Sequence, residues 1–191
     1  MKKLIGIILA MLSSVCMAQP NSLESNINVT VINNFQAESY LGDWYEIARI
    51  PFYFEDHCLA PVKANYKIDG ENIAVTNSCM TKENKLDTAH GMAYFTETDS
   101  KIAKLEVTFV PSWLRFTHIG RGDYWVLYTD YQYSLVGSPN HRYLWILSRS
   151  ETPDQTTIHK LLDIASQQGF DITKLHFNYP NLESMTSVPT K

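Results

Sequence analysis

The chain contains, at residues 40–49, the stretch Tyr40-Leu41-Gly42-Asp43-Trp44-Tyr45-Glu46-Ile47-Ala48-Arg49. From Gly42 to Ser148 apolar and polar residues alternate, aromatic and β-branched types are frequent, and turn-forming residues recur roughly every ten positions. This period of two is typical of antiparallel strands. The candidate strands are residues 44–50, 62–68, 72–80, 86–97, 102–110, 123–130, 133–137 and 143–148. Eight strands can close into a small up-and-down β-barrel with room for one ligand.

The connections between these strands differ in length. Asp69-Gly70-Glu71 and residues 97–100 are short turn segments of the kind that join hairpins, so strands adjacent in sequence should also be adjacent in space. The longer segments 51–61 and 111–122 should form the rim of one open end. That rim is expected to be apolar, because it carries Phe52, Tyr53, Phe54, Trp113, Leu114 and Phe116.

One α-helix is expected after the last strand, packed against the outside of the barrel. Thr152-Pro153-Asp154-Gln155 resembles a capping box with proline at the first helical position. Four apolar residues then fall on one face, and Gly169 is placed to end a helix of about sixteen residues. The apolar residues are Ile158, Leu161, Leu162 and Ala165. Residues 172–177 should form a short extra strand.

The first eighteen residues have the layout of a secretory signal peptide, with Lys2 and Lys3 before an apolar run and small residues up to Ala18. We therefore expect a signal peptide at 1–18, an N-terminal extension at 19–36, the barrel domain at 37–179 and a flexible C-terminal tail at 180–191. The expected product is exported, either periplasmic or secreted. Cys16 offers an alternative, an outer-membrane lipoprotein anchored there, although the preceding Val15 disfavours acylation because a small residue is needed.

The charge balance restricts the class of partner. The chain has 16 basic and 20 acidic residues, and cleavage after Ala18 would remove Lys2 and Lys3 to leave 14 against 20, a formal charge of −6. Such an acidic protein is unsuited to nucleic acid. It is also unsuited to simple electrostatic docking on anionic lipid.

Two cysteines remain after the signal peptide, Cys58 and Cys79. In an exported protein thiols usually pair, so we expect a disulfide between them that contributes on the order of 3 kcal/mol to stability. Two free buried thiols are the alternative. A catalytic Cys58 beside His57 is disfavoured, because adjacent residues on an extended chain point to opposite faces.

Three parts of the sequence resemble the signature regions of the lipocalin family in order and spacing: Gly42-Asp43-Trp44, Thr129-Asp130-Tyr131, and Arg149 at the close of residues 143–149. Residues 33–35, 40–49 and 143–149 further resemble the bacterial branch, which is similar to apolipoprotein D. The resemblance implies an eight-stranded barrel that binds a small hydrophobic molecule. It also implies structural roles at the closed end, where Trp44 would plug the barrel beneath Arg149 and Thr129 and Asp130 would fix a turn next to Tyr131.

Strand alternation, anchored on an inward Trp44, predicts which residues line the lumen. It also sends Ala48 and Ile50 inward. The lumen residues most expected to touch a ligand are Glu46, Ala64, Tyr66, Val75, Ala93, Phe95, Val107, Phe109, Tyr124, Tyr128 and Trp145. Small residues among large aromatics leave room for an acyl chain, with a polar head near Tyr66, Tyr124 or Tyr128.

Glu46 is a carboxylate predicted inside an apolar lumen, where an unpaired charge would be costly, so it should be protonated, paired with an arginine or lysine, or hydrated. One interpretation is recognition of a ligand hydroxyl or cationic head group. The other is hydrogen bonding to neighbouring lumen tyrosines or waters.

The expected function is to bind and store or transport a fatty acid, lysophospholipid or phospholipid in the cell envelope. No motif for nucleophilic, phosphate or metal chemistry occurs, and the six histidines are scattered, so no enzyme activity, metal or cofactor is expected. Two alternatives remain. One is an isomerase-like enzyme on the same barrel, which would need a free thiol or a poised acid, and the other is an interaction protein whose aromatic rim binds a partner or a membrane.

Overall fold

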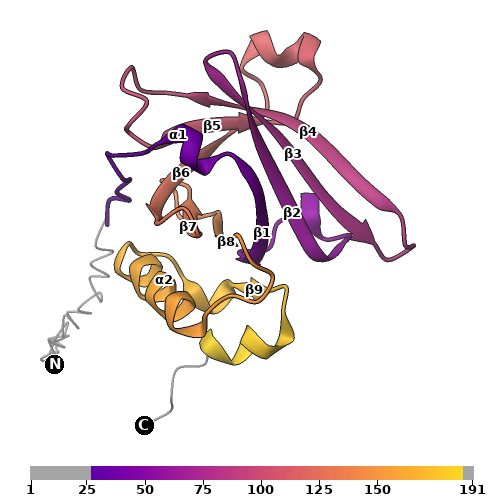
Figure 1. The fold of residues 1–191 in the computed structure, drawn as a ribbon, viewed down its shortest axis with the longest axis vertical. Coiled ribbons are helices and arrows are strands. Elements are labelled where there is room, and N and C mark those ends of the chain that lie inside the picture. The colour runs from indigo at the N-terminus through magenta and orange to yellow at the C-terminus, as the bar shows by residue number, and fades with distance from the viewer. Residues whose placement is uncertain (1–26, 187–191) are drawn as a thin grey trace, which may run out of the picture.

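A computed structural model describes residues 27–186 of the chain. The predicted signal peptide, Cys16 included, and residues 187–191 of the predicted tail lie outside this part. Within it the chain forms a closed antiparallel β-barrel with one longer helix beside it (Figure 1). The barrel strands are β1 (Gly42–Arg49), β2 (Cys58–Asp69), β3 (Asn72–Thr81), β4 (Leu86–Phe95), β5 (Lys104–Thr108), β6 (Arg121–Thr129), β7 (Tyr133–Gly137) and β8 (Leu144–Ser148).

Each strand pairs with its neighbour in sequence, and β1 pairs with both β8 and β2, which closes the barrel. The eight-stranded antiparallel barrel predicted from the sequence is thereby confirmed. The observed strands differ from the predicted ones mainly at their ends. β2 begins four residues earlier than predicted, while β5 spans only five residues.

The two long connections contain 3-10 helices, η1 (Tyr53–Glu55) and η2 (Ser112–Thr117). The tight connection between β2 and β3 turns at Gly70, whose φ of +62° is a conformation that glycine adopts without steric cost. A short helix, α1 (Ala37–Tyr40), precedes β1 and was not foreseen.

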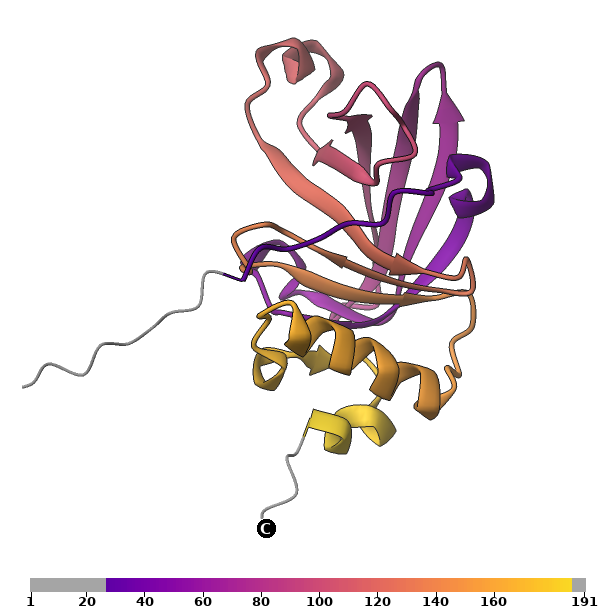
Figure 2. The same ribbon diagram turned by 90° about the vertical axis from the view of Figure 1, so that its left-hand side faces the viewer.

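The long helix α2 (Gln155–Gln167) lies alongside the barrel wall (Figure 2). Its N-cap is Asp154, whose carboxylate accepts a hydrogen bond from the Thr157 amide at 2.8 Å. The predicted capping box starting at Thr152 is therefore wrong by two residues, and the helix has 13 residues instead of about sixteen. None of the described helices is long and apolar enough to cross a bilayer.

The apolar face of α2 packs on the outer surface of the barrel. Its buried residues are Ile158, Leu161, Leu162 and Ala165, as the helical spacing predicts. They form one cluster with outward-facing residues of β1, β7 and β8, among them Ile47, Leu135 and Ile146. The second hydrophobic core lies inside the barrel around Trp44 and Tyr66.

After α2 the chain returns to the barrel. Residues Ile172–Lys174 form a 3-10 helix (η3), and only β9 (His176–Phe177) is extended, paired with Ala48 and Arg49 of β1. Pro180–Thr186 is a further 3-10 helix (η4) with Leu182 buried in the outer cluster. Residues 180–186 of the predicted tail are thus helical, and Leu182 packs against the barrel.

Two β-bulges alter which side chains face the lumen. The pairing register of β1 against β8 shifts between Glu46 and Ala48, and that of β6 against β7 shifts between Val126 and Tyr128. An extra residue in a strand exchanges inward and outward positions beyond it. Ala48 and Ile50 accordingly lie in the outer cluster, so their predicted inward orientation is wrong.

Candidate ligand-binding site

A cavity of about 430 Å³ lies inside the barrel. Apolar and aromatic side chains from several strands form most of its wall, and the segments around η1 and η2 border it. The lining residues are Glu46, Phe52, Phe54, Glu55, His57, Cys58, Val62, Lys63, Ala64, Tyr66, Val75, Asn77, Ser78, Cys79, Asp87, Ala89, Val107, Phe109, Val110, Gly120, Tyr124, Trp145 and Leu147. A space of this size and character suits a small apolar molecule.

Eight of the eleven predicted lumen residues line this cavity. They are Glu46, Ala64, Tyr66, Val75, Val107, Phe109, Tyr124 and Trp145. Alternation places them together because β2 and β3, which supply three of them, pair without a register shift from Lys63 to Asp69. The small side chain of Ala64, between Trp44 on β1 and Asn77 on β3, leaves part of this volume open.

The other three predicted residues lie elsewhere. Ala93 and Phe95 belong to the inner core beyond the cavity, packed near the closed end, where Phe35 lies against Phe95. Tyr128 faces away from the lumen, because the bulge in β6 turns it toward α2. Its hydroxyl accepts a hydrogen bond from Lys160 at 2.9 Å, and the same ammonium lies 4.4 Å from the centre of its ring. The predicted inward orientation of Tyr128 is therefore wrong.

A chain of hydroxyl groups forms the floor of the cavity. The Tyr40 hydroxyl donates to Ser134 Oγ at 2.9 Å, and Ser134 donates to the Tyr128 carbonyl. The Tyr124 hydroxyl lies 3.0 Å from that of Tyr40 and 2.9 Å from that of Tyr66. Since each phenol has one proton, Tyr124 donates to Tyr40, and Tyr66 donates to Tyr124.

The direction of this chain limits what the floor can bind. Every phenolic proton is used within the protein, so Tyr66 and Tyr124 offer only lone pairs to a ligand. Burial raises the pKa of Tyr40 to about 12 and raises those of Tyr66 and Tyr124 well above the ordinary value of 10, so all three stay neutral. The floor can therefore accept hydrogen bonds from a ligand, but it cannot donate them to a carboxylate or a phosphate.

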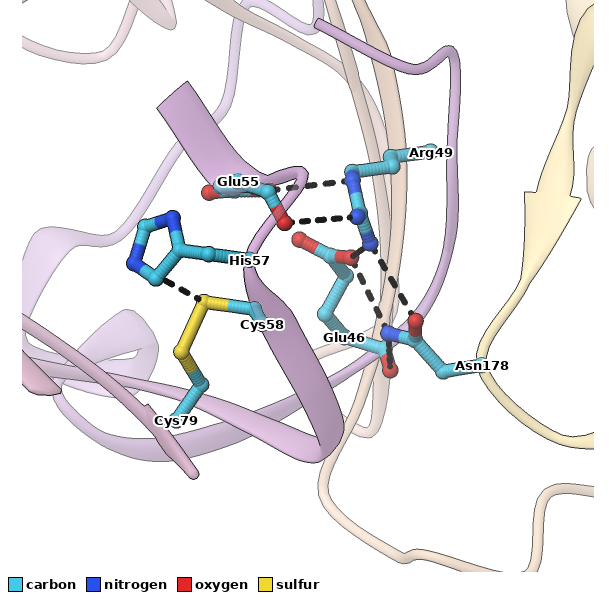
Figure 3. Close-up of polar contacts among 7 residues, drawn as sticks. All are labelled: Glu46, Arg49, Glu55, His57, Cys58, Cys79 and Asn178. Carbon is cyan, nitrogen blue, oxygen red and sulfur yellow. Dashed lines mark hydrogen bonds and ion pairs between the residues drawn. A yellow bond between two sulfur atoms is a disulfide. The ribbon is translucent and has the colours of Figure 1, made fainter. Parts of the chain in front are cut away.

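A buried ionic group lies at the side of the cavity (Figure 3). Glu46 Oε1 accepts hydrogen bonds from Arg49 Nη1 at 2.7 Å and from Asn178 Nδ2 at 3.0 Å. Arg49 Nε lies 3.3 Å from Glu55 Oε2, and Arg49 Nη2 donates to the Glu55 carbonyl at 3.1 Å. The Glu46 and Arg49 side chains are only 6 % and 5 % exposed, and that of Glu55 is 15 % exposed.

Arg49 reaches Glu46 because of the bulge in β1. In a regular strand, residues three apart point to opposite faces. The extra residue at Ile47 brings both side chains to the inner face, where Arg49 pairs across the sheet with Trp145 and Glu46 with Leu147. Glu46 is therefore paired with a cation, and its partners are not the lumen tyrosines suggested by the sequence.

Cys58 and Cys79 form the predicted disulfide, which is confirmed, and they join the ends of β2 and β3 at the cavity wall. His57 Nε2 lies 2.8 Å from Asp87 Oδ2 and also approaches Cys58 Sγ. Although the ligand atoms of His57, Cys58 and Cys79 lie within 4.8 Å of one another, both sulfurs are used in the disulfide. Only the imidazole remains, and a single imidazole is a poor metal site.

The closed end is built around Trp44 and Arg149. Trp44 is fully buried, and its indole Nε1 donates to the Tyr40 carbonyl at 2.8 Å. The Arg149 guanidinium lies 3.8 Å from the centre of the Trp44 ring. It also donates to the carbonyls of Asp43, Leu41, Ser39 and Tyr131. Gly42 has a φ of +93°, and a Cβ there would lie 3.5 Å from the guanidinium.

Side chains of Thr129 and Asp130 hold the turn between β6 and β7. Thr129 Oγ1 accepts from the Tyr131 amide and donates to the Tyr133 carbonyl, while Asp130 Oδ1 accepts from the Gln132 and Tyr133 amides. Tyr131 adopts a left-handed conformation with φ of +65°. Such local hydrogen bonds compensate a conformation that is costly for a residue other than glycine.

Sequence reasoning did not foresee several residues of the inner wall and floor. Arg49, Glu55 and Asn178 complete the ionic group, and Phe35 and Tyr40 close the barrel beneath Trp44. Glu55 and Asn178 lie in irregular segments, where alternation makes no prediction. Tyr40 directly precedes the stretch that forms β1, but a helix of four residues is too short for the spacing of its apolar residues to show which of them are buried.

Comparisons with known proteins agree with this architecture. A family model described as a lipocalin-like domain matches residues 35–180. The outer membrane lipoprotein Blc of Citrobacter freundii is 39 % identical over 151 residues, which cover 77 % of this chain and 80 % of that protein. Apolipoprotein D of Mus musculus is 36 % identical over 155 residues, which cover 76 % and 77 % of the two chains. The solved structure of insecticyanin from the tobacco hornworm Manduca sexta superposes with a TM-score of 0.62 at 25 % identity, covering 80 % of this chain and 84 % of that one.

Proposed function

Because the chain belongs to the lipocalin family, we propose that it binds a lipid with a long acyl chain in its barrel and stores or transports it in the cell envelope. The observation that carries this proposal is the 430 Å³ cavity with a wall that is largely aromatic and aliphatic. Each methylene buried there contributes about 0.8 kcal/mol, so an acyl chain can bind tightly with few polar contacts. A fatty acid, a lysophospholipid or one chain of a phospholipid supplies such a group.

The orientation of the ligand follows from the floor. Tyr66 and Tyr124 have no proton to donate, so a chain end without acceptors fits there best, and an anionic head group stays at the mouth. We therefore propose a lipid bound tail first.

Native mass spectrometry of the protein after mild extraction tests this function. We expect a co-purifying lipid at a ratio of one per barrel. We also expect a fatty acid or lysophospholipid to quench the fluorescence of Trp145, which lines the cavity. A protein that carries no lipid and shows no quenching with any member of either class would exclude the proposal.

An export route fits this function. The bacterial relative is by its name an outer membrane lipoprotein, and we propose that this chain is likewise exported, as a periplasmic or secreted protein or anchored at Cys16. The disulfide supports an oxidising compartment. Intact-mass measurement of the purified protein distinguishes cleavage after Ala18 from acylation at Cys16.

We propose binding without catalysis. An isomerase-like enzyme would need a free thiol or a poised acid, and Cys58 and Cys79 are joined to each other. In such an enzyme, Glu55 would serve as the poised acid. Conversion of a bound lipid, followed by mass spectrometry, would favour the enzyme over the carrier.

The aromatic rim supports a second role, contact with a lipid surface. We define the rim as Tyr53 and Phe54 of η1 with Trp113 and Phe116 of η2, whose exposed fractions are 63–79 %. Large exposed aromatic side chains at the mouth of a lipid cavity are suited to the interface of a membrane, and they would allow lipid to pass without crossing water.

Replacing Trp113 and Phe116 with serine tests this role. We expect the double variant to lose most of its co-sedimentation with phosphatidylcholine vesicles, because apolar burial supplies the binding energy. Ile68→Ser is the matched control, since Ile68 is 55 % exposed beside the β2–β3 turn, away from the mouth. Equal vesicle binding by all three proteins would refute a membrane role for the rim.

A further inference from the structure

The ionic group in the cavity wall has one carboxyl group more than its cation can neutralise. Glu46 and Glu55 both line the cavity, and both contact the single guanidinium of Arg49 (Figure 3). If both carboxyl groups were ionised, the group would carry a net negative charge in a nearly dry site. Such a charge is either neutralised by a proton or matched by a cation from outside the protein.

The other basic side chains that line the cavity are engaged elsewhere. His57 is paired with Asp87. The Lys63 ammonium lies 4.7 Å from the centre of the Tyr45 ring, and Tyr45 packs against the outer cluster. Asn178 is neutral and already donates to Glu46. Apart from Arg49, no basic side chain among the described residues that line the cavity is therefore free to neutralise the second carboxyl group.

Without a ligand, a proton on Glu55 removes the excess negative charge. Burial, then the charge of Glu46, raise the pKa of Glu55 from 4.5 to about 9, although Arg49 acts in the opposite direction. A compact cation with several donors could balance the second negative charge in place of this proton.

We propose that Glu46 and Glu55 form a subsite for the ammonium group of the bound lipid. The proposal rests on the lipid-binding function above and specifies the ligand as an amphiphile with a primary amine, of which an ethanolamine head group is one kind. An ammonium has three donors, so it can donate to both carboxyl groups, among them the buried Oε2 of Glu55, which has no hydrogen-bond partner among the described residues.

The proton balance of this step follows directly. The ligand amine enters as an ammonium and Glu55 releases its proton to water, so the net charge of the site is zero both before binding, with Glu55 protonated, and after it, with the ammonium in place. Binding of the amine should therefore be coupled to release of one proton from the protein. Binding of a neutral alcohol of the same length should not.

The titratable groups that face this pair come from four elements. Glu46 and Arg49 lie on β1, Glu55 on η1 and Tyr66 on β2, and Tyr179 approaches from the C-terminal segment. The pKa of Tyr66 is raised well above 10 and that of Tyr179 to about 12, so both phenols remain neutral below pH 9. Between neutral pH and pH 9, Glu55 is therefore the member of this set that exchanges its proton for the ligand.

The experiment compares dodecylamine, dodecan-1-ol and dodecanoic acid as ligands, with Trp145 fluorescence as the signal. At pH about 8 we expect the amine to bind at least about tenfold more tightly than the alcohol, since hydrogen bonds to charged groups are the stronger kind. The acid should bind more weakly than the amine. The ratio of amine to alcohol affinity should rise with pH by up to about tenfold per unit until Glu55 is ionised, because the amine itself stays protonated there.

The variant Glu55→Gln should bring the ratio of amine to alcohol affinity close to one and remove its pH dependence. Glu83→Gln is the matched control, because Glu83 is exposed in the β3–β4 loop and does not line the cavity. It should keep the ratio of the wild type. If the Glu55 variant fails to fold, the pH dependence of the amine-to-alcohol affinity ratio of the wild-type protein tests the subsite instead.

The outcomes separate this inference from the proposed function. Tight binding of the alcohol with no advantage for the amine at any pH would overturn the ammonium subsite and leave the lipid carrier standing. An advantage that persists unchanged in Glu55→Gln would also overturn the subsite. Binding of none of the three ligands would overturn the carrier.

Discussion

Trp44→Ala is expected to lower the free energy of unfolding by about 3–5 kcal/mol, the range for removing a large buried aromatic side chain. The indole is fully buried, bonded to the Tyr40 carbonyl and covered by the Arg149 guanidinium at 3.8 Å. Its loss leaves a cavity at the closed end and exposes that carbonyl and the guanidinium to an unfilled space. Urea denaturation followed by circular dichroism measures the change.

Trp113→Ala is the control for this substitution. Trp113 is 70 % exposed on η2, so its removal should change stability by less than about 0.5 kcal/mol. If the two variants lose the same stability, or if Trp44→Ala loses less than Trp113→Ala, the closed end does not depend on the Trp44 plug as we describe.

The largest expected effect on binding comes from filling the cavity. Ala64→Phe puts a ring into the space between Trp44 and Asn77, where an acyl chain would otherwise lie. If the ring displaces four methylene groups at about 0.8 kcal/mol each, the loss is about 3 kcal/mol, or roughly two orders of magnitude in affinity. Titration of the protein with dodecan-1-ol measures it.

Ala74→Phe provides the comparison for Ala64→Phe. Ala74 adjoins Val75 on β3, and since Val75 lines the cavity, Ala74 points outward. The same ring on the outer face should leave the affinity within about twofold of the wild type, a difference of roughly 0.4 kcal/mol. Equal affinity of the two variants would mean that the lipid binds outside the barrel.

The barrel itself could be predicted because its signal is repeated. Alternation marks each strand separately, and a misjudged end, such as that of β2, leaves the order of strands intact. The apolar face of α2 was likewise predictable from four residues at helical spacing. Its N-cap was not, because Thr152 and Asp154 are both good capping residues and the sequence does not show which one the chain turns at.

The cavity wall was less predictable than the fold. Alternation found the residues of β2 and β3 where the pairing, from Lys63 to Asp69, is regular, and it failed for Tyr128 and Ala48, each just beyond a bulge. A bulge depends on how two strands pair, so the sequence of either strand alone does not predict it. Glu46 stood out as a carboxylate in an apolar lumen, but its partners Glu55 and Asn178 come from segments without a period.

The inserted residue at Ile47 has a consequence for how such a barrel can evolve. Deleting it would restore regular pairing of β1 against β8 and leave Glu46 and Arg49 two positions apart on the same inner face, so their ion pair would remain. The apolar cluster under α2 would instead lose the side chain of Ile47. A strand of this barrel can thus gain or lose one residue at a bulge and change only the surface that packs against the helix, while the side chains that meet a ligand stay the same.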